Sequence, residues 1–291
     1  MLEILILINL SKRIGALAES RGSVKGRSQA LLLLLWFSGE FLGMSLGLGL
    51  AGGGGFLIAY ALALVGANSS AWLAFFAARR LDQSSLSRIW TIILAFIVIE
   101  ATPTLISILL NILDIEVGNL VWRTIDLLVT AAGGLILGWK LASNRPAWWW
   151  VAGMAVHWAI TFGAAYLLNL VEIEPLYGNM IFWTVYTTAA GLVIGFLFSQ
   201  EAPFQSRSPL LRLVVIGLIG GVIINTLNSW FYTGLVSPLR SLPLYSAWLL
   251  VESIYRGVLL GLLLGFGLEL PFLRKPAAPV GPVVDAQAPL G

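Results

Sequence analysis

Long apolar runs dominate this chain, and each is close to the length of a bilayer-spanning helix. A helix crosses the hydrocarbon core with about 20 apolar residues, and a soluble core could not bury so many runs of this kind. In lipid, only helices and closed barrels satisfy their own backbone hydrogen bonds. The sequence predicts an all-α, polytopic integral membrane protein with eight transmembrane helices at residues 29–50, 55–78, 89–113, 119–141, 147–170, 179–199, 209–233 and 244–268.

Composition supports this class and excludes others. Hydrophobic residues make up 58% of the chain and charged residues 11%, against about 25% charged in globular proteins. The absence of cysteine excludes disulfides, thiolate catalysis and thiolate metal sites. The net charge of +3 reflects membrane topology, so we expect no nucleic-acid partner. The expected partners are membrane lipids, with a homodimer or a larger membrane complex as alternatives.

Basic residues alternate with acidic turns along the chain and predict its orientation. The acidic turns carry Asp114 and Glu116, then Glu172 and Glu174, whereas most Lys and Arg lie in the other turns. The positive-inside rule then places both termini in the cytoplasm, in a bacterial inner membrane. We expect residues 1–28 to form an interfacial amphipathic segment, residues 29–270 the transmembrane domain, and residues 271–291 a disordered cytoplasmic tail.

Three segments repeat one another nearly letter for letter: Gly134–Trp139, Gly191–Phe196 and Gly261–Phe266. Each lies late in the second apolar run of a predicted hairpin. We interpret the hairpins 89–141, 147–199 and 209–268 as homologous units, and 29–78 as a divergent fourth. Because each unit has two spans, all copies share one orientation, as in tandem parallel repeats related by an axis along the membrane normal.

Small residues recur every four positions in several of these helices. Such stripes let helix backbones approach closely in lipid, so we predict packing within the chain, with a homodimer contact as the alternative. The glycines concerned are Gly39, Gly43, Gly47, Gly134, Gly138, Gly191, Gly195, Gly257, Gly261 and Gly265.

Several ionisable residues fall inside the predicted helices. A charge there costs about 2.5–3.5 kcal/mol on insertion scales and marks a functional site by default. Glu40, Glu100 and His157 each lie near the bilayer midplane, because each is about eleven residues into a helix that rises about 1.5 Å per residue. The residues that we predict to form a proton or substrate pathway are Glu40, Glu100, His157, Glu252, Arg256 and Asp126.

Two of these acids have no basic residue nearby in sequence. The sequence neighbours form two pairs: Arg123 with Asp126, and Glu252 with Arg256. Glu40 and Glu100 remain, and we expect them to be neutral because burial disfavours a charged carboxylate. They would bond to each other, to His157 or to water, either exchanging protons or serving as static contacts between helices.

No cofactor or metal site is predicted. The chain has one histidine, which excludes a histidine-rich metal site or a haem held by two histidines within one chain. A carboxylate site for Mg²⁺ or Mn²⁺ stays open as an alternative, since those ions accept oxygen ligands.

One short segment resembles part of a known motif. Glu252-Ser-Ile-Tyr-Arg256-Gly257 is similar to the glutamate-rich motif of CAAX-type intramembrane proteases. Ser253 replaces the second glutamate of that motif, and no histidine follows in the chain, although the family needs two later histidine motifs. The resemblance is therefore incomplete, and we assign no activity from it.

The function predicted from the sequence is transport of a small solute or ion, with protonatable carboxylates near the midplane. Parallel repeats and a proline-interrupted third helix suit a polar pathway. A non-catalytic scaffold, assembly factor or complex subunit is the alternative, favoured by the glycine stripes. An intramembrane enzyme centred on Glu252 and Arg256 is a third hypothesis. Because no complete catalytic motif is present, we expect the chain not to be an enzyme.

Overall fold

All the elements of the described chain are helices. A computed structural model describes residues 2–51, 55–171, 173, 175–201, 209–231 and 245–273. Glu172, Glu174 and the tail beyond residue 273 lie outside the described residues. The helices are α1 (Leu2–Glu19), α2 (Lys25–Ala51), α3 (Phe56–Arg80), α4 (Gln83–Ile112), α5 (Asn119–Leu141), α6 (Ala147–Leu170), α7 (Pro175–Ser199), α8 (Pro209–Phe231) and α9 (Tyr245–Leu273).

The helices fit a membrane-embedded protein. Seven of those described are long and apolar enough to cross a bilayer, and α8 adds a shorter apolar segment, Pro209–Asn225. Large apolar side chains also cover the outside of the bundle: Leu57 and Leu120 are each 81% exposed, and Trp139 is 76% exposed. Such a surface is unfavourable in water but suits contact with lipid tails.

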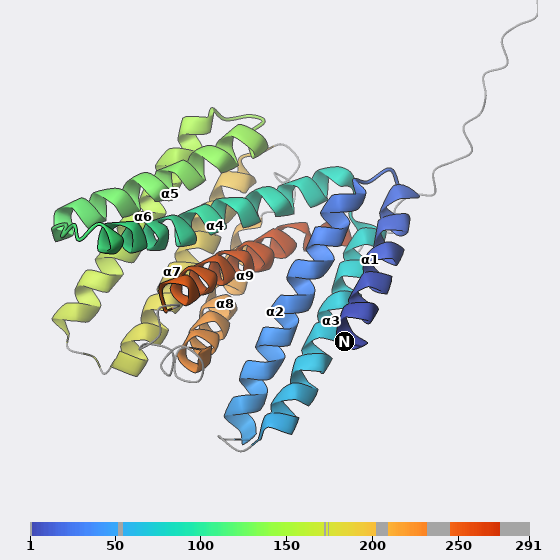
Figure 1. Cartoon of the computed structure of the whole chain (residues 1–291). Coiled ribbons are helices and arrows are strands. Elements are labelled where there is room, and N and C mark those ends of the chain that lie inside the picture. Colours follow the sequence, from blue (N-terminus) through green and yellow to red (C-terminus); the bar gives the residue numbers. More distant parts are fainter. Residues whose placement is uncertain are drawn as a thin grey trace, which may run out of the picture.

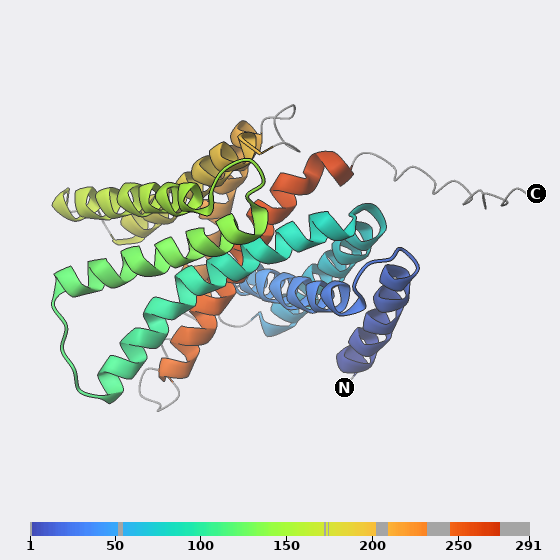
Figure 2. The same cartoon turned by 90° about the horizontal axis from the view of Figure 1, so that it is seen from above.

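Helices α4 to α9 pack in a closed ring. Each contacts its neighbour in sequence, and α9 returns to pack along α4. Figures 1 and 2 show α9 crossing beside α4, although more than 100 residues separate them in the chain. A core of buried side chains that includes Phe96, Trp150 and Ile194 joins the ring's helices.

The hairpin of α2 and α3 lies beside this ring, with α1 packed against it (Figure 1). Its helices approach so closely that a Cβ on Gly43 would lie 2.0 Å from the carbonyl oxygen of Leu62. Alanines fill the buried face of α3, and their small side chains permit this approach. Leu31, Ala74 and Val258 belong to the core cluster that joins the hairpin to α4 and α9.

The repeated glycine segments lie at three corresponding contacts in the ring. On α5, Gly134 and Gly138 face the backbone of α6. On α7, Gly191 and Gly195 face that of α8, whereas on α9 the glycines 257, 261 and 265 face α4. The glycines of α5 and α7, the second helices of two hairpins, thus meet the first helix of the next hairpin. Those of α9, the last helix, meet α4, the first helix of the ring.

Asp82 caps α4, and its removal should destabilise the protein. Its carboxylate accepts a hydrogen bond from the Ser85 backbone N–H at 2.7 Å and from the Ser84 hydroxyl at 3.0 Å. We expect Asp82→Ala to lower the free energy of unfolding by about 0.5–2 kcal/mol, and Asp82→Asn, which can still cap, to lower it less. Thermal or denaturant unfolding in detergent measures both; equal losses would contradict the capping role.

The contribution of this cap should depend on pH. Burial raises the pKa of Asp82, but the hydrogen bonds from Ser85 and Ser84 and the charge of Arg88 outweigh it, so its pKa lies below the ordinary 3.8. A lowered pKa in the folded state means that the stabilisation is complete above the unfolded value and is lost as pH falls through the folded one. The difference between wild type and Asp82→Asn should therefore shrink below about pH 4.

Candidate functional site

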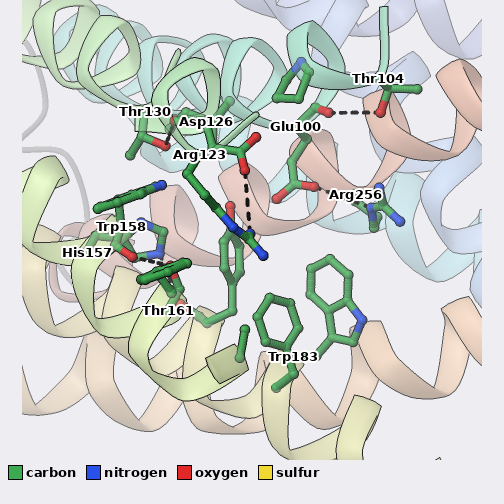
Figure 3. A pocket seen from close by; sticks show the side chains of 16 residues that line it. Glu100, Thr104, Arg123, Asp126, Thr130, His157, Trp158, Thr161, Trp183 and Arg256 are labelled. Carbon is green, nitrogen blue, oxygen red and sulfur yellow. Dashed lines mark hydrogen bonds and ion pairs between the residues drawn. The ribbon is translucent and has the colours of Figure 1, made fainter. Parts of the chain in front are cut away.

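Five helices of the ring line a partly open cavity of about 270 Å³ with polar and aromatic walls. Figure 3 shows its ionisable side chains converging from different helices. Glu100 comes from α4, Arg123 and Asp126 from α5, His157 from α6 and Arg256 from α9. Four of the six predicted pathway residues therefore share one space: Glu100, Asp126, His157 and Arg256.

Arg256 joins two carboxylates at one edge of this cavity. Its Nη1 donates to Glu252 Oε1 at 2.8 Å, and its Nε lies 3.3 Å from Glu100 Oε2. The second contact is close enough for an ion pair but is not aligned as a hydrogen bond. Nη2 donates to the Ser253 hydroxyl at 3.1 Å. The Arg256 guanidinium also lies over the Trp183 ring, 5.2 Å from its centroid, which favours a cation electrostatically.

These contacts correct one prediction from the sequence. The expectation that Glu100 lacks a basic partner is wrong, because Arg256 supplies one from a helix 156 positions further along the chain. Glu100 shares that single guanidinium with Glu252, and the Tyr186 hydroxyl is within hydrogen-bonding reach of Glu100.

Local sequence places Glu100 beside a missing backbone hydrogen bond in the continuous helix α4. Pro103 lies inside this helix and lacks an N–H, so it cannot donate to the carbonyl of Ile99. Both residues line the cavity. Thr104, one turn after Glu100, meets the Ser253 hydroxyl of α9 at 2.7 Å. The missing backbone hydrogen bond at Pro103 and the Thr104–Ser253 contact therefore both lie at the depth of the Glu100–Arg256 pair.

Arg123 and Asp126 are held loosely. Their closest charged atoms are 3.9 Å apart, and their side chains are 47% and 35% exposed. The Arg123 guanidinium lies over Phe162, 4.9 Å from the ring centroid. No hydrogen bond to the Asp126 carboxylate is formed within the described part of the chain, so its oxygens can accept from a solute in the cavity.

His157 presents a free acceptor. The side chain is 1% exposed, and its Nε2 lies 3.2 Å from the backbone oxygen of Tyr186. Because a carbonyl can only accept, Nε2 carries the proton, and in the neutral ring Nδ1 is then an acceptor. Nδ1 has no partner among the described residues. His157 lines the cavity, but Nδ1 itself is buried and not exposed to that space.

Charge and aromatic rings together define what the cavity can hold. Glu100, Asp126 and Glu252 bring three carboxylates against the two guanidiniums of Arg123 and Arg256. The carboxylates therefore outnumber the guanidiniums by one. The walls are aromatic, with Trp158, Phe162, Phe182, Trp183 and Tyr186. The site therefore favours a proton or a small cation.

Glu40 does not line this cavity. It lies on α2, with the Trp36 side chain within hydrogen-bonding reach and Glu3 of α1 nearby. The prediction that Glu40 and Glu100 share one site is therefore wrong. Their depths are similar, but their helices occupy different parts of the molecule.

Two buried acids escaped the sequence prediction. Glu269 of α9 is fully buried and pairs with Arg88 at 2.6 Å. Glu201, just after α7, accepts hydrogen bonds from the Ser143 backbone and hydroxyl. Both lie at helix ends, where sequence alone suggests solvent. For Glu269, the sequence offered one indication, the distant run Ser84-Ser85-x-x-Arg88, whose polar groups need a partner. We find no such indication for Glu201.

Metal binding has no evident site in the described ranges, where no group of three or more His, Asp or Glu residues is placed to hold an ion.

Comparison with known proteins finds no relative: no family model matches the chain, and neither a curated protein nor a solved structure does.

Proposed function

We propose that this protein transports a small organic cation across a membrane and binds it in the cavity lined by Glu100, Asp126 and His157. The observation that carries the proposal is the convergence of ionisable side chains from five helices on one space of about 270 Å³. Charged groups inside a membrane domain are costly and are retained where they serve a polar pathway. Contacts that only joined helices would not need a shared cavity.

The chemistry of the walls favours a cation that bears N–H groups. Such a solute neutralises the excess carboxylate, donates to Asp126, and lies against aromatic faces. A water molecule occupies about 30 Å³ of liquid, so the cavity suits a solute the size of several waters.

Glu100 is the residue we assign to coupling. It faces Arg256, whose charge Glu252 already balances at a shorter distance, 2.8 Å against 3.3 Å. A carboxylate in that position holds either the cation or a proton, but not both. Alternation between the two would exchange protons for solute.

The proposal includes a specific topology. α8 is 23 residues long, which supports its being an eighth span, with both termini in the cytoplasm. The corresponding glycine contacts support three tandem hairpins, α4–α5, α6–α7 and α8–α9, arranged about an axis along the membrane normal. Closure of such a ring would place the solute site between the repeats, as in other repeat-built transporters.

Exchange in proteoliposomes tests the function. Vesicles containing a pH-sensitive dye receive guanidinium chloride outside, or urea, which has nearly the same shape and no charge. Guanidinium stays protonated at neutral pH, so it carries no protons by itself. We expect guanidinium, and not urea, to raise the internal pH in the presence of the wild-type protein.

Two matched substitutions locate the site. Glu100→Gln should slow the exchange by at least about tenfold, the effect of losing a hydrogen bond to a charged group. Glu40→Gln makes the same chemical change at similar depth outside the cavity and should leave the rate unchanged. Equal loss in both variants, or a wild-type protein that does not respond to guanidinium, would refute the assignment. A scaffold protein would give no response in any of these vesicles.

A further inference from the structure

A second, basic groove lies at the end of the bundle where α2 and α4 begin and α5 ends. It has a volume of about 410 Å³. Arg27 of α2 and Lys140 of α5 bring two positive charges to it from different helices, and α4 contributes Ser87 and Trp90. The groove shares no lining residue with the Glu100 cavity.

The polar groups of this groove have no hydrogen-bond acceptor among the described residues, although the Lys140 ammonium lies over the Trp139 ring, 5.1 Å from its centroid. No described carboxylate pairs with Arg27 or Lys140, whereas Arg88 and Lys25 nearby both have one. The Ser87 hydroxyl forms no hydrogen bond to a described residue. The indole N–H of Trp90 is buried with no described partner. Two exposed cations and the Ser87 hydroxyl therefore line one groove without an acceptor from the described chain, which indicates an anionic ligand.

The layout of the groove is amphiphilic. The α4 residues Ser87, Trp90 and Leu94 lie three and four positions apart, which places them along one face of the helix. Leu94 is about 10 Å from Ser87 along the helix axis, since each residue rises about 1.5 Å, and it is 51% exposed. The polar end of the groove thus lies at the helix ends and its apolar end at membrane depth.

We propose that this groove binds an anionic phospholipid. The phosphate accepts hydrogen bonds from Arg27, Lys140 and the Ser87 hydroxyl, and an acyl chain lies along Leu94. Basic pockets between transmembrane helices are suited to anionic headgroups. A free phosphate would use only the polar end of the groove. The exposed apolar end at Leu94 fits a lipid tail. The bound lipid joins α2 to α4 and α5, and thereby the α2–α3 hairpin to the ring.

Lipid retention tests this assignment. Full-length protein is reconstituted in nanodiscs of phosphatidylcholine, with or without phosphatidylglycerol as the minor component. Native mass spectrometry then counts the lipids that stay bound, and thermal melting follows stability. We expect one retained phosphatidylglycerol and a higher melting temperature when it is present. Arg27→Gln with Lys140→Gln should weaken retention roughly thirtyfold, the effect of two cations near an anionic headgroup.

Matched variants separate the groove from general surface charge. Lys12→Gln with Arg13→Gln removes the same two charge types from exposed positions on α1 and should retain the lipid. Gly26→Glu offers a second test, because a Cβ on Gly26 meets no atom within 4 Å. The added carboxylate would compete with the phosphate for Arg27 without disturbing packing, so retention should fall.

Two outcomes would overturn the proposal. One is undiminished phosphatidylglycerol retention in both Arg27→Gln/Lys140→Gln and Gly26→Glu. The other is an equal rise in melting temperature when inorganic phosphate is added to phosphatidylcholine nanodiscs, which would identify a free anion as the ligand.

Discussion

Replacing Glu269 by alanine is expected to lower the free energy of unfolding by about 3–5 kcal/mol, because it removes the carboxylate that pairs with the mostly buried Arg88 guanidinium. Glu269 accepts from Arg88 Nε at 2.6 Å and from Nη2 at 3.2 Å, and the Ser85 hydroxyl donates to it at 2.7 Å. The carboxylate is fully buried, and the Arg88 side chain is only 18% exposed. These contacts close the ring, since they join the end of α9 to the beginning of α4.

Two further variants show whether the effect comes from the loss of this buried ion pair. Glu19→Ala breaks the exposed pair with Lys25, at 3.3 Å, and should change stability by at most about 1 kcal/mol. Glu269→Leu combined with Arg88→Met removes both charges and should recover much of the loss, because apolar replacements of a buried pair are often nearly neutral. Equal stability of Glu269→Ala and Glu19→Ala in a denaturant titration would contradict this account.

The helices were predictable from the sequence because their signal is local. Each apolar run supplies the apolar length that a span needs, and turn residues such as Asp82 and Pro146 lie at its ends. Most predicted ends therefore fall within a few residues of the helices, as at α5 (Asn119–Leu141) and α6 (Ala147–Leu170). The principal difference is α4, which begins six residues earlier than predicted because Asp82 caps it.

The pairing of helices was not predictable in the same way. The glycine segments indicate close contacts, but a stripe of small residues does not specify which helix it meets. Gly257 and Gly261 contact α4, and this long-range closure decides that Arg256 reaches Glu100. Counting charges along the chain paired Arg256 only with Glu252, four residues away, and so left Glu100 without a partner.

Depth in the membrane can be counted from sequence, whereas the direction of a side chain around its helix cannot. Glu40 and Glu100 are equally far into their predicted spans, 29–50 and 89–113, yet only Glu100 faces the cavity. The rotation of α2 is fixed by its glycine face, since Gly39 and Gly43 must lie against α3. That contact directs Glu40, next to Gly39, away from the ring.

The glycine contacts also predict where the ring tolerates no added atom. A Cβ on Gly191 would lie 2.1 Å from the carbonyl oxygen of Leu213 on α8. This neighbour is backbone and cannot rotate away, so α7 and α8 would have to separate. We expect Gly191→Ala to lower the free energy of unfolding by about 1–3 kcal/mol, the usual cost of overpacking, and to lower the melting temperature in detergent accordingly.

Gly163→Ala on α6 is the matched control, because a Cβ there meets no atom within 4 Å. Alanine is the better helix former by about 1 kcal/mol, so this variant should be neutral or stabilising. The same gain in helix propensity acts at Gly191. A net loss of stability in Gly191→Ala therefore means that the steric cost exceeds this gain. If Gly191→Ala were at least as stable as Gly163→Ala, backbone contact at this position would not hold α7 and α8 together. The α7–α8 contact would then no longer correspond to the glycine contacts of α5 with α6 and of α9 with α4.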